Sequence, residues 1–131
     1  MANRITAINA HRPRIELGNT VQKQELLRYI ADRTGLNEGS VDIVLRELRD
    51  GIIFFNRAGR AVKIEGLGTY TPTIGIDGVL DMGYRADSAL KNGLNTPGAF
   101  TGNIFNRDNI GKTSEELVAM WNAAHPDDPV S

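Results

Sequence analysis

The 131-residue chain contains no cysteine, which excludes disulfide bonds, zinc–thiolate sites and a cysteine nucleophile. It has no apolar run of membrane-spanning length, and its N-terminus lacks the apolar core of a secretory signal peptide. From these absences we expect a soluble, cytoplasmic protein that does not bind membranes. The length corresponds to about one domain, and 40% hydrophobic residues suffice for a core.

An excess of positive charge is also missing, because the formal net charge is −1. Residues 1–19 contain three arginines and one glutamate, for a net charge of +2. Residues 20–95 contain ten basic and ten acidic side chains, and residues 96–131 contain two basic and five acidic ones, for a net charge of −3. The total gives no global indication of nucleic-acid binding, so any contact with DNA must come from a local patch.

The most informative pattern is the segment 61–70, Ala-Val-Lys-Ile-Glu-Gly-Leu-Gly-Thr-Tyr. Val62 and Ile64 alternate with charged residues, which is the period of a half-buried strand. Gly66 and Gly68 permit a sharp turn, after which a second strand begins. The segment is therefore predicted to form a strand–turn–strand unit whose apolar face needs a covering layer of helices.

Two amphipathic helices are predicted before this unit. The first begins near Gln22, and Gly35 is a natural left-handed terminator for it. Asn37 caps a second, longer helix. The apolar stripe of the second helix contains Val41, Val44, Leu45, Leu48, Ile52 and Phe55, while Ile43, Ile53 and Phe54 lie off that stripe. A helix that is apolar on more than one side indicates burial against a partner chain.

A hairpin is predicted after Tyr70, with its turn at Asp77-Gly78. A two-residue loop would place an apolar residue opposite Asp81, whereas a three-residue loop gathers the apolar residues on one face. We therefore predict the three-residue loop Ile76-Asp77-Gly78, with the cross-strand pairs Ile74–Leu80, Pro72–Met82 and Tyr70–Tyr84. Because proline cannot donate to a ladder, the strand should be an edge or bulged at Pro72.

Three further segments complete the chain. Residues 1–19 are interpreted as an N-terminal arm or a short strand, the strand running from Arg4 to Ala10. The basic residues of this segment either bind phosphate or belong to a solvated terminus. Asp87 should cap a short helix with a buried pair of leucines, Leu90 and Leu94. Residues 96–131 are interpreted as a C-terminal extension, in which an irregular Asn/Gly-rich segment precedes one helix. That helix starts at the capping box Thr113-x-x-Glu116 and should bury Leu117 and Trp121.

Several short segments resemble one known family. They are Leu26, Ile30 and Ala31 in the first helix, Thr34-Gly35-Leu36 at its end, residues 62–70 around the Gly-x-Gly turn, and residues 84–91, Tyr-Arg-Ala-Asp-Ser-Ala-Leu-Lys. Together with the order of the elements, they resemble the HU and integration host factor family of bacterial histone-like DNA-binding proteins. The resemblance extends from Val21 to Leu94, over 74 of the 131 residues. Leu67 stands where the family usually has phenylalanine.

The resemblance implies an α+β fold with two N-terminal helices, a three-stranded antiparallel sheet and a short helix. It also implies an intertwined homodimer whose pooled sheets form a saddle, with the HU-like domain at residues 20–95. The family bends DNA with two long hairpin arms, each with an intercalating proline near its tip. Here the hairpin from Tyr70 to Tyr84 has only fifteen residues and lacks the basic run and the Asn-Pro signature. The saddle, and not an arm, is therefore expected to contact DNA.

The candidate DNA-binding residues lie before and on the first strand and at the far end of the sheet. They are Arg57, Arg60, Lys63, Arg85 and Lys91. On an HU-like saddle they could neutralise phosphates without reading bases. The competing interpretation is that they are solvated charges paired with Glu65, Asp81 and Asp87.

No group of residues in the sequence supports a nucleotide-binding, metal-binding or catalytic site. Gly111-Lys112-Thr113 is missing the glycine of a phosphate-binding loop at position 106, and Gly66-x-Gly68 lacks the third glycine of a dinucleotide site. His11 and His125 lie at opposite ends of the chain without other metal ligands nearby. The sequence thus predicts no enzyme, cofactor or metal.

Two functional hypotheses remain. The first is non-sequence-specific binding of duplex DNA through a dimeric β-saddle without long arms, in the nucleoid. The second is a dimeric structural or protein-interaction module derived from HU, with little or no DNA binding. In the second hypothesis the acidic extension, residues 96–131, docks a protein partner or covers the saddle.

Overall fold

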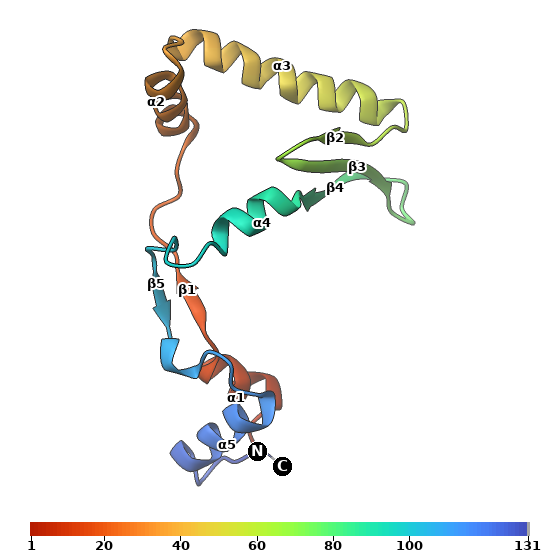
Figure 1. The fold of residues 1–131 in the computed structure, drawn as a ribbon. Helices are drawn as coiled ribbons and strands as arrows, with labels where there is room; N and C mark the ends of the chain where they lie inside the picture. Colours follow the sequence, from red (N-terminus) through yellow and green to blue (C-terminus); the bar gives the residue numbers. More distant parts are fainter. Residues whose placement is uncertain (131) are drawn as a thin grey trace. The chain divides into compact units, whose positions relative to one another are not determined.

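The computed structural model describes residues 1–130 and divides the chain into two compact units. The central unit is Val21–Phe100. The terminal unit combines Met1–Thr20 with the C-terminal segment from Thr101 onward. Figure 1 labels the helices and strands of both units. The protein is thus an α+β protein with antiparallel sheets, as the sequence predicted.

The central unit begins with the two predicted helices, α2 (Lys23–Thr34) and α3 (Glu38–Arg57). Gly35 ends α2 with a φ of 76°, and its N–H donates to the carbonyl of Ala31. Asn37 caps α3, because its side-chain oxygen accepts a hydrogen bond from the Ser40 N–H at 2.7 Å. Both predicted helix boundaries are confirmed.

A three-stranded antiparallel sheet follows, in the order β2 (Val62–Ile64), β3 (Gly68–Ile74) and β4 (Leu80–Ala86). The predicted pairs of the hairpin are all present: Ile74 with Leu80, Pro72 with Met82, and Tyr70 with Tyr84. The Gly75 N–H donates to the Val79 carbonyl at 3.0 Å and closes the three-residue loop, in which Gly78 has a φ of 82°. Side-chain parity therefore sufficed to choose the loop length.

Two residues of β3 explain the local shape of this sheet. Pro72 lies beyond Tyr70, the last residue of β3 that pairs with β2, so the strand is an edge there, as predicted. A Cβ atom on Gly68 would collide with the Arg85 carbonyl oxygen and would lie 2.6 Å from the Tyr84 ring. Only glycine fits at this position, which accounts for the second glycine of the Gly-x-Gly turn.

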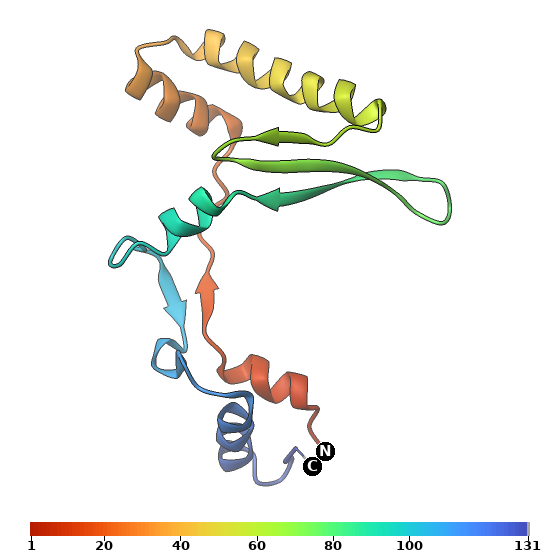
Figure 2. The same cartoon turned by 45° about the vertical axis from the view of Figure 1, so that its right-hand side comes forward.

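Helix α3 lies along one face of the sheet (Figure 2). On this face Val62 and Ile64 are half-buried, and the Asn56 side-chain amide donates to the Tyr70 carbonyl at 3.3 Å. The rings of Tyr70 and Tyr84 lie 5.0 Å apart, centroid to centroid. The sheet therefore has a helix-facing side and an outer side.

The core of one chain is small, and much of the apolar surface of α3 is uncovered. Val41 and Ile52 of α3 are buried, whereas Ile43, Val44 and Phe54 are each at least 60% exposed. The predicted stripe of α3 is thus buried only in part.

Helix α4 (Ser88–Leu94) is capped by Asp87 as predicted, but its predicted buried pair is wrong. Leu90 is 39% and Leu94 is 67% exposed. The reason is that no element within residues 1–130 makes extensive contact with this helix.

The terminal unit begins with a helix, α1 (Arg4–His11), where the sequence was interpreted as a short strand. That interpretation is wrong for two physical reasons. The Asn3 side chain accepts a hydrogen bond from the Ile5 N–H and starts a helix. In addition, α1 packs against α5 (Ser114–Ala124) from the other end of the chain and buries Ala7. A local pattern contains no information about a partner so far away in sequence.

The segment interpreted as irregular contains a strand, β5 (Asn103–Phe105), and a short 3₁₀ helix, η1 (Arg107–Asn109). β5 pairs antiparallel with β1 (Arg14–Glu16) to form a second, two-stranded sheet. The Asn109 side-chain amide donates to the His11 carbonyl at 2.6 Å, and Asn109 is buried. Contacts between the two ends of the chain thus hold this unit together.

Helix α5 has the predicted N-terminus, because the Thr113 hydroxyl accepts from the Glu116 N–H at 3.2 Å. Leu117 is buried, as predicted. Trp121 is half-buried, and its ring stacks on His125 with centroids 3.7 Å apart. None of the helices in residues 1–130 is both long enough and apolar enough to cross a membrane.

Candidate nucleic-acid interface

The register of the central sheet places three polar side chains in one row across all three strands. Lys63 of β2 pairs with Thr69 of β3, and Thr69 pairs with Arg85 of β4. Paired residues of neighbouring strands project from the same face. The next row, Val62–Tyr70–Tyr84, projects from the other face, toward α3. Lys63 and Arg85 therefore lie together on the outer side of the sheet, where both are exposed.

The outer side changes from basic to acidic along the hairpin. Beyond the row of Lys63 and Arg85 it presents Thr71 and then the pair Thr73–Asp81. At the loop, the Asp77 carboxylate accepts a hydrogen bond from the Val79 N–H at 3.0 Å. An anionic backbone would therefore be attracted at the base of the hairpin and repelled at its tip.

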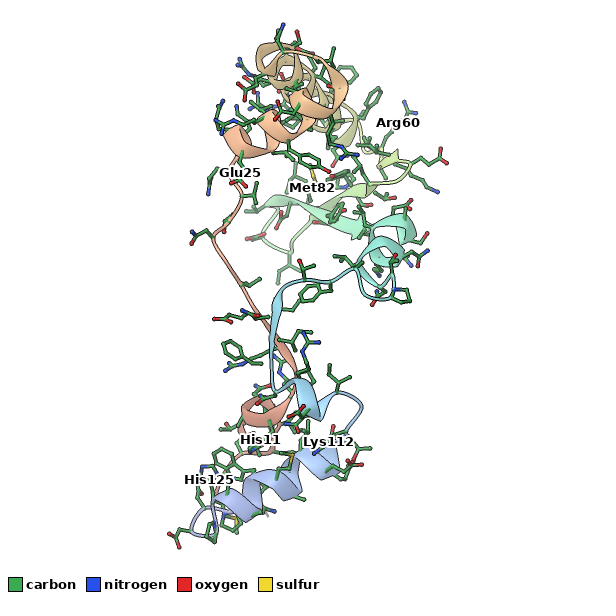
Figure 3. The ribbon with its side chains drawn as sticks, turned by 60° about the vertical axis from the view of Figure 1, so that its left-hand side comes forward. His11, Glu25, Arg60, Met82, Lys112 and His125 are labelled. Carbon is green, nitrogen blue, oxygen red and sulfur yellow. The ribbon has the colours of Figure 1, made fainter. Side chains whose placement is uncertain are left out.

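Arg57 and Arg60 lie elsewhere. Arg57 is the last residue of α3 and lines a groove of about 530 Å³ on the helix-facing side. The other lining residues are mainly apolar and include Ile53, Pro72, Ile74 and Met82. The guanidinium of Arg60, labelled in Figure 3, lies 5.3 Å from the centroid of the Phe55 ring. Neither arginine belongs to the row on the outer side.

Lys91, the fifth candidate, is exposed on α4. The structure therefore brings two of the five predicted residues, Lys63 and Arg85, into one row, and distributes the other three over the end of α3, the following loop and α4. Within residues 1–130, none of the five forms an ion pair closer than 4.0 Å. The predicted pairing with Glu65, Asp81 and Asp87 is thus not seen in this part of the chain.

Sequence reasoning missed the threonines of β3. Thr69, Thr71 and Thr73 alternate with apolar residues and present hydroxyl groups on the outer side, between and beyond the two cations. Hydroxyl groups are common donors to phosphate oxygens. The alternation from position 69 to 74 was visible in the sequence and would have identified this face.

The two histidines lie in the same unit of the structure. His11 and His125 both lie in the terminal unit (Figure 3). His125 stacks on Trp121, and its Nδ1 lies 3.2 Å from the Trp121 carbonyl oxygen. Across residues 1–130, no three side chains of the metal-binding types come together.

Comparison with known families matches residues 7–92 to a family described as an HU domain fused to a winged helix-turn-helix, an immunoglobulin-like or a glycine-rich motif. The chain belongs to this family. The resemblance to histone-like DNA-binding proteins that the Gly-x-Gly turn and the 84–91 segment predicted is thereby confirmed.

Among solved structures, the HU-family chain is similar to a single-residue mutant of HU from Thermotoga maritima. The two share 21% sequence identity with a TM-score of 0.48, over 55% of this chain and 96% of the other. Comparison with curated proteins finds no match.

Proposed function

We propose that this HU-family chain binds duplex DNA without sequence specificity, as a homodimer that pools two central sheets into a saddle. The row formed by Lys63, Thr69 and Arg85 on the outer side of the sheet is the observation that supports this proposal. In this row two exposed cations flank a hydroxyl group. Such a row can neutralise phosphates but cannot distinguish bases. The protein would act at the nucleoid in the cytoplasm, and no catalytic step is assigned to it.

The homodimer is supported by the apolar surface that one chain leaves open. The central unit exposes apolar side chains on α3, an apolar groove beside Ile53 and Met82, and the two leucines of α4. Uncovered apolar area of this extent is unusual for a monomer and indicates a protein–protein interface. A second copy that covers it would leave the outer sides of both sheets free for DNA.

The hairpin sets the limits of the proposed interface. From Tyr70 to Tyr84 it contains two aspartates and no basic residue. It therefore cannot extend the contact along the DNA backbone by charge attraction. We expect a short contact of about four phosphates per dimer, two from each protomer, and a slope of log K against log salt of about −4.

The decisive experiment is a salt titration of duplex binding by fluorescence anisotropy, with the mass of the protein measured in solution. In the double variant Lys63→Ala, Arg85→Ala, the salt slope should approach zero and affinity should fall equally for unrelated sequences. The variant Arg33→Ala, which removes an exposed arginine of α2 that lies over Tyr29, is the matched control and should bind as the parent does. No binding by the parent at low salt, or equal losses in both variants, would contradict the proposal.

The second candidate function is a dimeric protein-interaction module with little DNA binding. The acidic hairpin and the net charge of −1 favour it. The same titration separates the two functions. A protein that is dimeric in solution but does not bind DNA at low salt would support the interaction module. The fold would then be intact, and the basic row would be insufficient for DNA binding.

A further inference from the structure

The two-stranded sheet of the terminal unit has a free edge. β1 pairs with β5 on one side, and within residues 1–130 no strand lies on its other side. Each strand has only three residues. A two-stranded sheet of this size is marginal by itself, and an open edge offers backbone donors and acceptors to another strand.

The sequence of β1 is complementary to itself. β1 reads Arg14-Ile15-Glu16. If two copies align antiparallel about Ile15, Arg14 of each copy lies opposite Glu16 of the other. Opposite charges directly across two strands stabilise their pairing, and like charges destabilise it. We propose that β1 of one chain pairs with β1 of a second copy across a two-fold axis, so that two terminal sheets join into one of four strands.

Both charged residues of β1 are available for this contact. Arg14 and Glu16 are exposed, and neither forms an ion pair in the part of the chain that the structure describes. The Arg14 guanidinium lies 4.8 Å from the centroid of the Phe105 ring of β5, which holds it at the sheet. The antiparallel alignment gives both charges a partner at once.

The other face of the joined sheet would be apolar. Ile15 pairs with Ile104 of β5, so the two-fold axis would place Ile104, Ile15, Ile15 and Ile104 in one continuous row. Ile15 is 55% exposed in a single chain. The Ile15 side chain of each copy then covers that of the other, which reduces the apolar area in contact with water.

The free edge of β1 suits pairing with a second copy better than the free edge of β5 does. β5 reads Asn103-Ile104-Phe105, and pairing it with itself would set an amide opposite an aromatic ring without any charge complementarity. Pro13 precedes β1 and would lie opposite Leu17 of the second copy. Because proline lacks an N–H, it ends the ladder there and fixes a short, defined register. The resulting contact is isologous, as two-fold pairs are.

Disulfide trapping tests the register directly, because the 131-residue chain has no cysteine of its own. In Ile15→Cys the two new thiols would face each other with Cα atoms about 5 Å apart, which permits a disulfide. In the control Leu17→Cys, the thiols would lie four residues apart along the strands, about 13 Å. Leu17 is 86% exposed, so random collisions would favour the control. Under mild oxidation with diamide, we expect Ile15→Cys to form covalent dimers at least tenfold faster.

This comparison is independent of DNA binding and of any dimer formed by the central unit. Such a dimer gives no reason for the Ile15→Cys thiol to react faster than the more exposed one at position 17. Equal rates for the two variants, or a faster rate for Leu17→Cys, would overturn the proposal. Circular dichroism of both variants verifies that the folds are unchanged.

Charge reversal provides the second test. In the Ile15→Cys background, Arg14→Glu and Glu16→Arg each set like charges opposite each other, and each should slow trapping about tenfold. The two reversed chains complement one another, so a mixture should form mixed dimers in preference to either homodimer, as mass spectrometry can show. The double reversal Arg14→Glu, Glu16→Arg should restore the original rate. Trapping that is indifferent to these reversals would overturn the proposal.

Discussion

The central unit is one continuous stretch of chain, Val21–Phe100, whereas the terminal unit joins two stretches from opposite ends. Helices α2 and α3 meet across a short connection, and the hairpin closes on itself through a three-residue loop. In the terminal unit, by contrast, the Asn109 amide reaches His11, 98 positions away. Closing such a loop has an entropic cost, which the contacts inside the terminal unit help to offset. The two units should therefore respond separately to mutations.

The natural chromophores allow this separation to be measured. The single tryptophan, Trp121, lies in the terminal unit, and the three tyrosines, Tyr29, Tyr70 and Tyr84, all lie in the central unit. Tryptophan fluorescence excited at long wavelength thus reports unfolding of the terminal unit. Tyrosine near-ultraviolet circular dichroism reports the central unit, so denaturant titrations followed by both signals show which unit a mutation affects.

The largest effect is expected from Gly68→Ala. The added Cβ would collide with the Arg85 carbonyl oxygen. This oxygen belongs to the backbone of β4, which cannot shift as easily as the end of a flexible side chain. We expect the tyrosine transition to lose about 4 kcal/mol of stability, with the tryptophan transition unchanged. The matched control is Gly66→Ala, since Gly66 has a φ of 84° but nothing within 4 Å of the added Cβ. The Gly66→Ala variant should lose about 1 kcal/mol of stability, because alanine is disfavoured in the left-handed conformation. Equal losses in the two variants would contradict the steric explanation.

The next largest effect is expected from Leu117→Ala, in the other unit. Leu117 is 5% exposed, and truncation leaves a cavity in the small core of the terminal unit. Loss of about 2–4 kcal/mol should appear in the tryptophan transition only. Leu17→Ala, at a position that is 86% exposed, is the control and should change neither transition. If the tyrosine signal moved together with the tryptophan signal, the two units would be a single cooperative structure.

The contrast between the units also explains what the sequence could predict. In the central unit, the helix boundaries at Gly35 and Asn37 and the register of the hairpin follow from local rules of capping and side-chain parity. In the terminal unit, α1 was misinterpreted as a strand although Ile5 and Ile8 have the i, i+3 spacing of a helix face. Two apolar residues are weak evidence alone, and the partner helix α5 lies at the other end of the chain. Strands β1 and β5 were missed for the same reason.

Prediction of the candidate site was limited in a similar way. Lys63 and Arg85 could be placed on one face only after the register was known, because each lies on a different strand. Arg57 and Lys91 were added by proximity in sequence, and they lie outside that row, at the end of α3 and on α4. Charge counting finds the candidates, but the register of the sheet decides which of them share a face.

A smaller effect is expected from Asn109→Ala, which tests the link between the two ends of the chain. The buried Asn109 amide donates to the His11 carbonyl at 2.6 Å, and alanine leaves that carbonyl without its partner. The tryptophan transition should lose about 1–2 kcal/mol. Asn103→Ala, at an exposed position of β5, is the control for asparagine removal and should be nearly neutral. A loss confined to the tyrosine transition would show that the hydrogen bond does not stabilise the terminal unit.

The smallest effects are pH-dependent and concern one carboxylate in each unit. In the central unit, hydrogen bonds from Arg46 and then from Lys23, 2.9 Å away, lower the pKa of Asp42 from 3.8 to about 2. In the terminal unit, a hydrogen bond from its own backbone N–H and one from Arg4 lower the pKa of Glu115. A carboxylate with a lowered pKa in the folded state stabilises the fold above its unfolded pKa. That stabilisation is lost as the pH falls through the folded value.

Asp42→Asn should therefore destabilise the tyrosine transition near pH 6, and its difference from the parent should shrink as the pH falls from about 4 toward 2. Glu115→Gln should act on the tryptophan transition, and more weakly. The Glu115 side chain is 76% exposed, whereas that of Asp42 is 15% exposed, and solvent screens an exposed ion pair. A larger effect at Glu115 than at Asp42 would show that backbone capping of α5 outweighs the bridge between α2 and α3. The terminal unit would then depend on its helix ends more than the central unit depends on its ion pairs.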